Sequence, residues 1–289
     1  DTEHAPRIEF WGTNSRIGFS DWTVDIVYRL NQWRHRQTAL RCPVRPIQRQ
    51  KIGKMRVLLF DIDGTLLQTN GGGSNALKKA MQREFGLHDA TTEIDFSGRT
   101  DRSLLEEILA LNALPRTSDH LSRLRHCYVS LFPRVLDERG GRVLPGAVDL
   151  LEHLNNVPNV ISHVMTGNLP ETATHKLEHF GLRHYFAEIF GGEHDVHRND
   201  LARRTADSIR TLHGEAAAGN MIVIGDTPAD IQCGHAVGAR VLAVCSGRHR
   251  RHELECENPM SVQDDLTNLP ELIRLLTAAR PPTGQPDAH

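Results

Sequence analysis

The chain has 289 residues, of which 39% are hydrophobic and 24% charged, and a net charge of −2. This composition is typical of a globular protein with one large domain or two moderate ones. No apolar run approaches the roughly 20 residues that a membrane-spanning helix needs, so we expect no membrane partner. Acidic residues outnumber basic ones after residue 54, which argues against nucleic acid as a partner.

Residues 1–54 differ from the rest of the chain. They carry ten Lys/Arg, only five Asp/Glu, and all three tryptophans. We expect this basic N-terminal extension to lie outside the fold. One hypothesis is that translation naturally begins at Met55, and intact mass of the native protein would test it. A basic arm that binds a partner and a processed targeting peptide are the alternatives.

The first strong signal is the apolar run at residues 57–60, which has the length and branching of a buried parallel strand. Asp61 and Asp63 follow it, and Gly64 permits a sharp exit. Ligands bind at this end of the strands in an open α/β sheet. Two carboxylates two residues apart on an extended chain project the same way. Because such acids repel each other unless a cation or proton lies between them, the pattern predicts a metal, a reaction, or both.

A helical insertion is predicted over residues 71–141. Apolar side chains recur at helical spacing in 76–85, 104–111 and 121–132, and Thr100 or Asp101 is the expected N-cap of the second helix. Glycines at 71–73 and 140–141 flank the insertion and could serve as hinges. Arg99 and Asp101 are candidate substrate contacts, although both could merely cap the helix.

Strands and helices alternate over the remainder of the fold, which we place at 55–70 and 142–280. The pattern predicts an α/β fold with a Rossmann-like, three-layer parallel-sheet core. Residues 281–289 are predicted to be a disordered tail. Strands are expected at 160–165, 189–190, 221–224 and 241–244, and helices at 147–154, 170–180, 199–213, 228–237 and 266–279.

Three later segments add polar groups to the same edge of the sheet. Thr166, Gly167 and Asn168 follow one predicted strand, and Asp226 and Asp230 follow another. Lys176, on an intervening helix, is the only lysine after Lys79, so a compact charge is favoured there over arginine. We expect these groups to converge with Asp61 and Asp63. Such hard oxygen ligands favour Mg²⁺.

These motifs make the chain resemble the haloacid dehalogenase superfamily of phosphohydrolases over roughly residues 55–275. DxDGT is matched by Asp61 to Thr65, the Ser/Thr motif by Thr166, and GDxxxD by Gly225 to Asp230. Leu144-Pro145-Gly146 and Gly98-Arg99-Thr100-Asp101 resemble the phosphoglycolate phosphatase-like branch, which lies near the β-phosphoglucomutase-like proteins and has a helical C1 cap. The insertion at 71–141 would be that cap.

One motif departs from the family pattern. Many relatives carry a lysine in a Lys-Pro pair shortly before GDxxxD, whereas the comparable stretch here, residues 196–201, has no lysine. Either Lys176 supplies the charge from the preceding helix, or Arg198 substitutes for it. We expect Lys176 to do so and to orient Asp61.

The resemblance implies a Mg²⁺-dependent phosphatase that acts on a small phosphorylated metabolite such as phosphoglycolate. Asp61 would form a phosphoaspartate, and Asp63 would act as acid and then base. Asp61, the backbone carbonyl of Asp63 and Asp226 would hold Mg²⁺, with Asp230 acting through water or Lys176. The phosphate oxygens would be bound by Thr166, Gly167, Asn168 and Lys176.

Other functions stay open on the same scaffold. A phosphosugar mutase is the main alternative, and a catalytically silent binding module is a weaker one. Asp63 argues against a dehalogenase, which typically lacks the second aspartate. The five cysteines lack CxxC spacing, so we expect reduced thiols in a cytoplasmic protein. We expect a monomer or a homodimer.

Overall fold

A computed structural model describes residues 55–92 and 94–278. Both the N-terminal extension and the tail at 281–289 therefore lie outside the described residues. Among the helices that are described, none is long and apolar enough to span a membrane. The strands are β1 (Arg56–Phe60), β2 (Leu67–Gln68), β3 (Arg142–Val143), β4 (Val160–Met165), β5 (Ile189–Phe190), β6 (Met221–Gly225), β7 (Arg240–Val244) and β8 (Ser261–Gln263).

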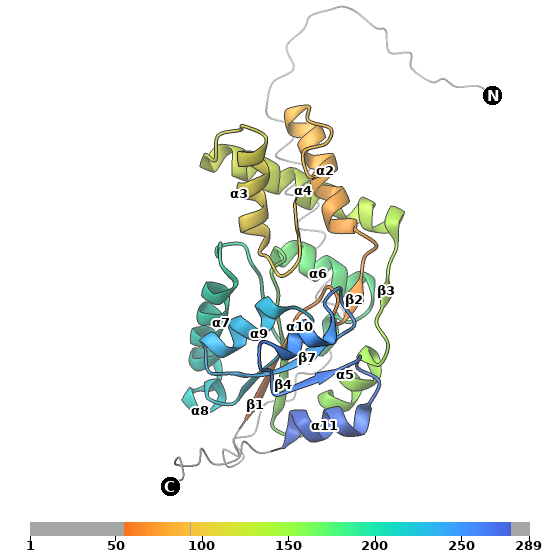
Figure 1. Cartoon of the computed structure of the whole chain (residues 1–289), viewed down its shortest axis with the longest axis vertical. Coiled ribbons are helices and arrows are strands. Elements are labelled where there is room, and N and C mark those ends of the chain that lie inside the picture. Colours follow the sequence, from red (N-terminus) through yellow and green to blue (C-terminus); the bar gives the residue numbers. More distant parts are fainter. Residues whose placement is uncertain (1–54, 93, 279–289) are drawn as a thin grey trace, which may run out of the picture. The chain divides into compact units, whose positions relative to one another are not determined.

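A parallel sheet forms the centre of the fold (Figure 1). Its strand order is β5-β4-β1-β6-β7-β8, and every neighbouring pair is parallel. The chain first extends the sheet on one side of β1, through β4 and β5, and then returns to the other side at β6. The strand order therefore reverses next to β1, and such a reversal opens a ligand-binding crevice at the carboxyl ends of the strands.

Helices cover both faces of the sheet. The described helices are α2 (Gly72–Phe85), α3 (Asp101–Leu111), α4 (Ser118–Arg139), α5 (Ala147–Asn155), α6 (Pro170–His179), α7 (Arg198–His213), α8 (Glu215–Ala218), α9 (Pro228–Ala236), α10 (Arg251–Glu255) and α11 (Leu269–Thr277), with a 3₁₀ turn at Arg183–Tyr185.

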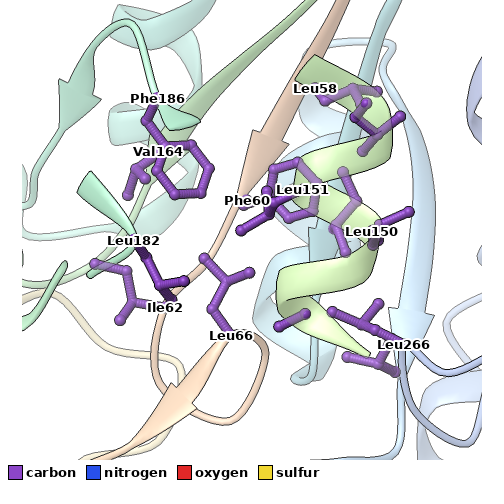
Figure 2. Packing of buried hydrophobic residues seen from close by; sticks show 14 of the residues in the cluster. Leu58, Phe60, Ile62, Leu66, Leu150, Leu151, Val164, Leu182, Phe186 and Leu266 are labelled. Carbon is purple, nitrogen blue, oxygen red and sulfur yellow. The ribbon is translucent and has the colours of Figure 1, made fainter. Parts of the chain in front are cut away.

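Alternation along β1 divides the core into two layers, because successive side chains of a strand point to opposite faces. Leu58 and Phe60 pack with side chains of α5, α6 and α11. Figure 2 shows them with Leu150 and Leu151 of α5. Val57 and Leu59 pack on the opposite face with side chains of α7, α8, α9 and α10. The predicted α/β fold with a parallel sheet between helical layers is confirmed.

The insertion between β2 and β3 has a hydrophobic core of its own. Buried side chains of α2, α3 and α4 form it, including Leu77, Ile108 and Phe132. Thr100 caps α3, as predicted, by accepting a hydrogen bond from the Ser103 N–H at 3.2 Å. We call these three helices the cap helices, and their mobility stays a prediction.

Several elements differ from those predicted. Gly72 and Gly73 begin α2, so of the three glycines at 71–73 only Gly71, with φ of 76°, has the backbone of a turn glycine. The two connections to the cap helices pair as the antiparallel strands β2 and β3. The sequence pattern also missed α10 and β8, which are too short to show a period. The last helix begins at Leu269 rather than at residue 266, because Pro270 occupies its first turn.

Candidate active site

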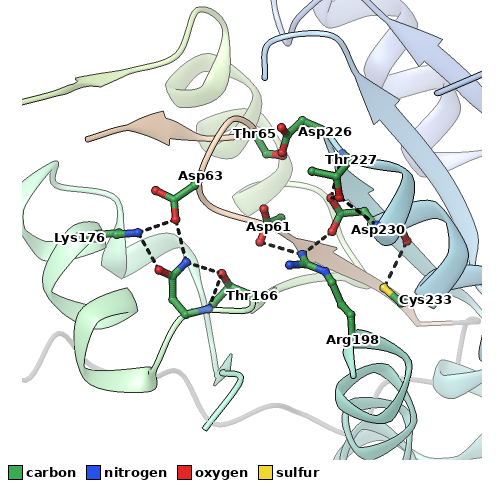
Figure 3. Close-up of polar contacts among 11 residues, drawn as sticks. Asp61, Asp63, Thr65, Thr166, Lys176, Arg198, Asp226, Thr227, Asp230 and Cys233 are labelled. Carbon is green, nitrogen blue, oxygen red and sulfur yellow. Dashed lines mark hydrogen bonds and ion pairs between the residues drawn. The ribbon is translucent and has the colours of Figure 1, made fainter. Parts of the chain in front are cut away.

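The first two aspartates leave the end of β1 toward different partners (Figure 3). The Asp61 N–H still bonds to the Ile224 carbonyl of β6 at 2.9 Å. After that the chain turns, because the Ile62 carbonyl accepts from the N–H groups of three following residues. The period of two that aligns side chains holds only within a strand. Asp63 is thus separated from the partners of Asp61, in contrast to the shared direction that we predicted.

Three carboxylates converge as predicted. One oxygen from each of Asp61, Asp226 and Asp230 lies within 4.8 Å of the others, and all three residues are buried. Asp226 follows β6 and accepts a hydrogen bond from the Thr65 hydroxyl at 3.2 Å. Asp230 lies in the first turn of α9 and forms a capping box with Thr227. The strand end and the helix start together fix this acid cluster.

Arg198 is the cation of the acid cluster. Its guanidinium Nη2 lies 3.0 Å from Asp61 Oδ1 and also donates to Asp230 Oδ1. The side chain is buried, at the first position of α7. Our expectation that Lys176 orients Asp61, or that Asp230 works through Lys176, is therefore wrong. The alternative, in which Arg198 takes the place of the missing lysine, matches the geometry because its Nη2 contacts both carboxylates.

Lys176 instead pairs with Asp63. Its ammonium Nζ lies 2.5 Å from Asp63 Oδ2 and 2.7 Å from Asn168 Oδ1. Asn168 Nδ2 also donates to Asp63 Oδ2, at 2.8 Å, and to the Thr166 hydroxyl, at 2.8 Å. We refer to Asp63, Asn168, Lys176 and Thr166 as the lysine cluster. The site therefore has two halves, each with its own cation.

Burial controls the electrostatics of the acid cluster. It raises the pKa of Asp61 to about 6, against the opposing attraction of Arg198. Burial also raises the pKa of Asp226 well above its usual value, and the neighbouring Asp230 and Asp61 raise it further. The pKa of Arg198 is raised well above its ordinary value by the two aspartates it contacts, despite its burial. One guanidinium thus faces three buried carboxylates, which leaves an excess of negative charge.

That excess fits a divalent cation. Mg²⁺ in proteins binds oxygen ligands that carry negative charge, usually one or two carboxylates together with several waters. Asp61 and Asp226 are the residues that would hold it, whereas Asp230 pairs with Arg198. The carboxylate of Asp63 belongs to the lysine cluster, so its backbone carbonyl stays the predicted ligand.

Adding Mg²⁺ to the metal-free protein is expected to raise its Tm more at pH 7.5 than at pH 5. The raised pKa of Asp61 means that its protonated form stabilises the fold fully below about pH 4, and that this contribution is lost as the pH rises through about 6. Mg²⁺ binds the ionised form, so it competes with the proton. Thermal melting with and without Mg²⁺ after chelation measures the difference at each pH. Equal increments in Tm at both pH values would contradict the assignment.

Loops at the same edge contribute residues that the sequence analysis missed. Gly247 lies beside Asp226, and a Cβ there would collide with the Asp226 carboxylate. The Ser246 hydroxyl donates to the Gly64 carbonyl at 2.7 Å. Thr65, within the DxDGT motif, bonds to Asp226. The position of Ser246 and Gly247 directly after β7 was the available signal, because all parallel strands end at one edge.

Arg99 and Asp101 take different positions at the start of the cap helices. The Asp101 carboxylate accepts from the Leu169 N–H at 2.7 Å, and its own N–H donates to the Gly167 carbonyl at 2.6 Å. Asp101 thus ties α3 to the loop that carries Thr166 and Asn168. Arg99 pairs with Glu107 on α3. Both residues also line the cavity described below, so their contact with substrate stays a prediction.

Asp101→Ala is expected to lower the free energy of unfolding by about 1–3 kcal/mol, because it leaves the buried Leu169 N–H without its acceptor. Asp101→Asn retains an acceptor oxygen and removes the ionisable carboxyl group, whose pKa is raised to about 6 by burial. We therefore expect the asparagine variant to be at least as stable as the wild type at pH 7. Urea denaturation measures both variants. A loss of equal size in the two would contradict this role for the side-chain oxygen.

The two halves of the site open into one cavity of about 470 Å³. Core residues Asp61, Asp63 and Thr166 form part of its lining, together with Arg198 and Lys176. Residues of the insertion, including Arg99, Asp101 and Tyr128, line it as well, and Arg248 follows β7. Acidic, basic and hydroxyl side chains therefore face a single cavity.

Comparison with known proteins shows the family to which the chain belongs. Phosphoglycolate phosphatase of Cereibacter sphaeroides is 30% identical over 229 residues, which is 76% of this chain and 98% of that protein. Phosphoglycolate phosphatase of Photobacterium profundum is 26% identical over 231 residues, covering 76% and 96%. The crystal structure of a hydrolase from Pseudomonas syringae aligns with a TM-score of 0.58, at 24% identity, over 77% of this chain and 99% of that one. The model of the haloacid dehalogenase-like hydrolases matches residues 58–244, and the chain belongs to that family.

Proposed function

We propose that this hydrolase is a Mg²⁺-dependent phosphatase that cleaves a small phosphate monoester through a phosphoaspartate on Asp61. The observation that carries the proposal is the meeting of three buried carboxylates with a single guanidinium at the reversal of strand order. Such a site holds a cation and an anionic phosphate together. The curated relatives that match over most of the chain are phosphoglycolate phosphatases.

The reaction takes two displacements. In the first, an Asp61 oxygen attacks phosphorus, the ester P–O bond breaks, and Asp63 gives its proton to the departing oxygen, so that the alcohol leaves. In the second, Asp63 takes a proton from water as that water attacks phosphorus, and the bond between phosphorus and Asp61 breaks. Inorganic phosphate leaves and both aspartates return to their starting forms. Dividing the reaction in this way replaces one difficult step by two easier ones.

The surrounding residues bind and orient the reactants. Arg198 holds Asp61 through Oδ1, which leaves the other carboxylate oxygen for attack. Thr166 and the backbone near Gly167 would bind phosphate oxygens. Bound Mg²⁺ would offset the negative charge of the phosphate and the aspartates. Positioning and electrostatics of this kind dominate catalysis of phosphoryl transfer.

The proposed substrate is a small phosphorylated acid of the phosphoglycolate type. The curated relatives support this class by name, and Arg99 and Arg248 add positive charge to the lining of the cavity. We further propose a cytoplasmic location, from the cysteine spacing.

Release of inorganic phosphate from a panel of monoesters, with and without Mg²⁺, tests the proposal. We expect turnover that depends on Mg²⁺ and favours small phosphorylated acids. The panel includes β-glucose 1-phosphate, assayed both for phosphate release and for isomerisation. Isomerisation without phosphate release would identify a mutase instead, and no turnover of any ester would favour a silent binding module.

A further inference from the structure

We propose that Lys176, together with Asn168, positions the Asp63 carboxylate for proton transfer to the leaving group. This inference rests on the proposed phosphatase function and deepens it. It assigns the lysine to the half of the site that handles the leaving group, and not to the nucleophile. The assignment follows from three observations: the contacts of Asp63, the way the lysine is held, and its neighbour on the cap helices.

Both hydrogen bonds to Asp63 converge on one of its two oxygens. Lys176 Nζ and Asn168 Nδ2 reach Oδ2 at 2.5 and 2.8 Å (Figure 3). Within the residues that the structure describes, no hydrogen bond to Oδ1 is found. An acceptor held by two donors has a fixed direction, and its partner oxygen is then fixed too. These two hydrogen bonds, which we call the clamp, therefore orient the free oxygen Oδ1. A group that transfers a proton needs an oxygen fixed in this way.

The clamp is held from the inside of the protein. The Lys176 side chain is 3% exposed, whereas that of Asp63 is 41% exposed. Asn168 accepts from the lysine through Oδ1 and donates to the Thr166 hydroxyl through Nδ2. Neither donor can turn away without losing a second bond. The half-exposed carboxylate thus adopts a position that buried groups determine.

A cap helix supplies the remaining side of the clamp. The Lys176 ammonium lies 5.7 Å from the centre of the Phe132 ring on α4. The face of an aromatic ring attracts a cation at this distance. Phe132 is fully buried in the hydrophobic cluster of the cap helices. The lysine is therefore fixed by contacts with both the core and the insertion.

A positioning role has a signature that general damage to the fold lacks. When the ester P–O bond breaks, its electron pair passes to the leaving oxygen, and an alkoxide needs the proton from Asp63 at that moment. A p-nitrophenolate is stable without it. Loss of the clamp should therefore reduce cleavage of an alkyl ester much more than cleavage of an aryl ester.

Lys176→Met tests this role with phosphoglycolate and p-nitrophenyl phosphate as the two probes. The ratio kcat/KM is compared, because it reports on the first displacement alone. We expect a loss of about 100-fold for phosphoglycolate and of less than about 10-fold for the aryl ester. Asn168→Ala should show the same split. Lys78→Met, which removes an exposed lysine paired with Asp89, should change neither value.

Equal losses for the two esters in both variants would overturn the proposal. If Lys176→Met does not fold, Asn168→Ala carries the same comparison. If the wild type cleaves neither ester, the proposed function fails, and crystal structures of the variants then decide the positioning role. A displaced Asp63 carboxylate would support it, and an unchanged carboxylate in both variants would refute it.

Discussion

Asp61→Asn is expected to reduce Mg²⁺-dependent phosphate release by on the order of 10⁴-fold or more, because an amide cannot replace the attacking carboxylate. The substitution preserves the shape of the side chain and its contact with the strand end. The protein should therefore remain folded. Steady-state phosphate release, with thermal melting of the same samples, measures both effects.

Asp149→Asn is the matched control, since this aspartate is exposed in the first turn of α5. We expect it to retain full activity. Residual turnover by Asp61→Asn at more than a few per cent of the wild type, after removal of contaminating phosphatases, would exclude Asp61 as the nucleophile.

Arg198→Met is expected to damage both stability and catalysis. Removing one partner of a buried ion pair costs about 3–5 kcal/mol, because the remaining charges are left buried without compensation. Asp61 would lose its orienting contact as well, so we expect kcat to fall at least about 100-fold. Arg198→Lys keeps the charge but replaces the guanidinium, whose Nη2 contacts both carboxylates, with a more strongly hydrated ammonium on a different stem. Its stability and kcat should lie between those of the wild type and of Arg198→Met. Urea denaturation and kcat are the measurements.

Arg203→Met provides the control from the same helix. Arg203 pairs with Asp200, and both side chains are about half exposed, at 58% and 49%. An exposed pair contributes at most about 1 kcal/mol. Equal stability of the Arg198 and Arg203 variants would show that the guanidinium in the acid cluster does not compensate buried charge.

The sheet and the strand-end acids could be predicted from the sequence because they follow simple periods. The apolar run of β1 is buried on both faces, and its end is followed by Asp61 within one residue. The same reasoning located Asp226 after β6. Once parallel strands are recognised, their carboxyl ends must share one edge. This is why three carboxylates from distant segments were expected together.

The pairing of cations with acids could not be predicted in the same way. It depends on the reach and direction of long side chains, which periodicity does not encode. Lys176 lies in α6 and Arg198 begins α7, both near the carboxyl ends of the strands. Each nevertheless contacts a different aspartate. The scarcity of lysine suggested a role for Lys176 but not which carboxylate it contacts. The turn after Ile62, which separates Asp63 from Asp61, was likewise invisible in the sequence.

The stereochemical course at phosphorus tests the central claim most directly. The substrate is a phosphate monoester made chiral at phosphorus by the three stable isotopes of oxygen, and phosphoryl transfer to an acceptor alcohol reports the configuration of the product. Two successive displacements through Asp61 predict overall retention. Inversion would show a single direct displacement and would contradict a phosphoaspartate in this site.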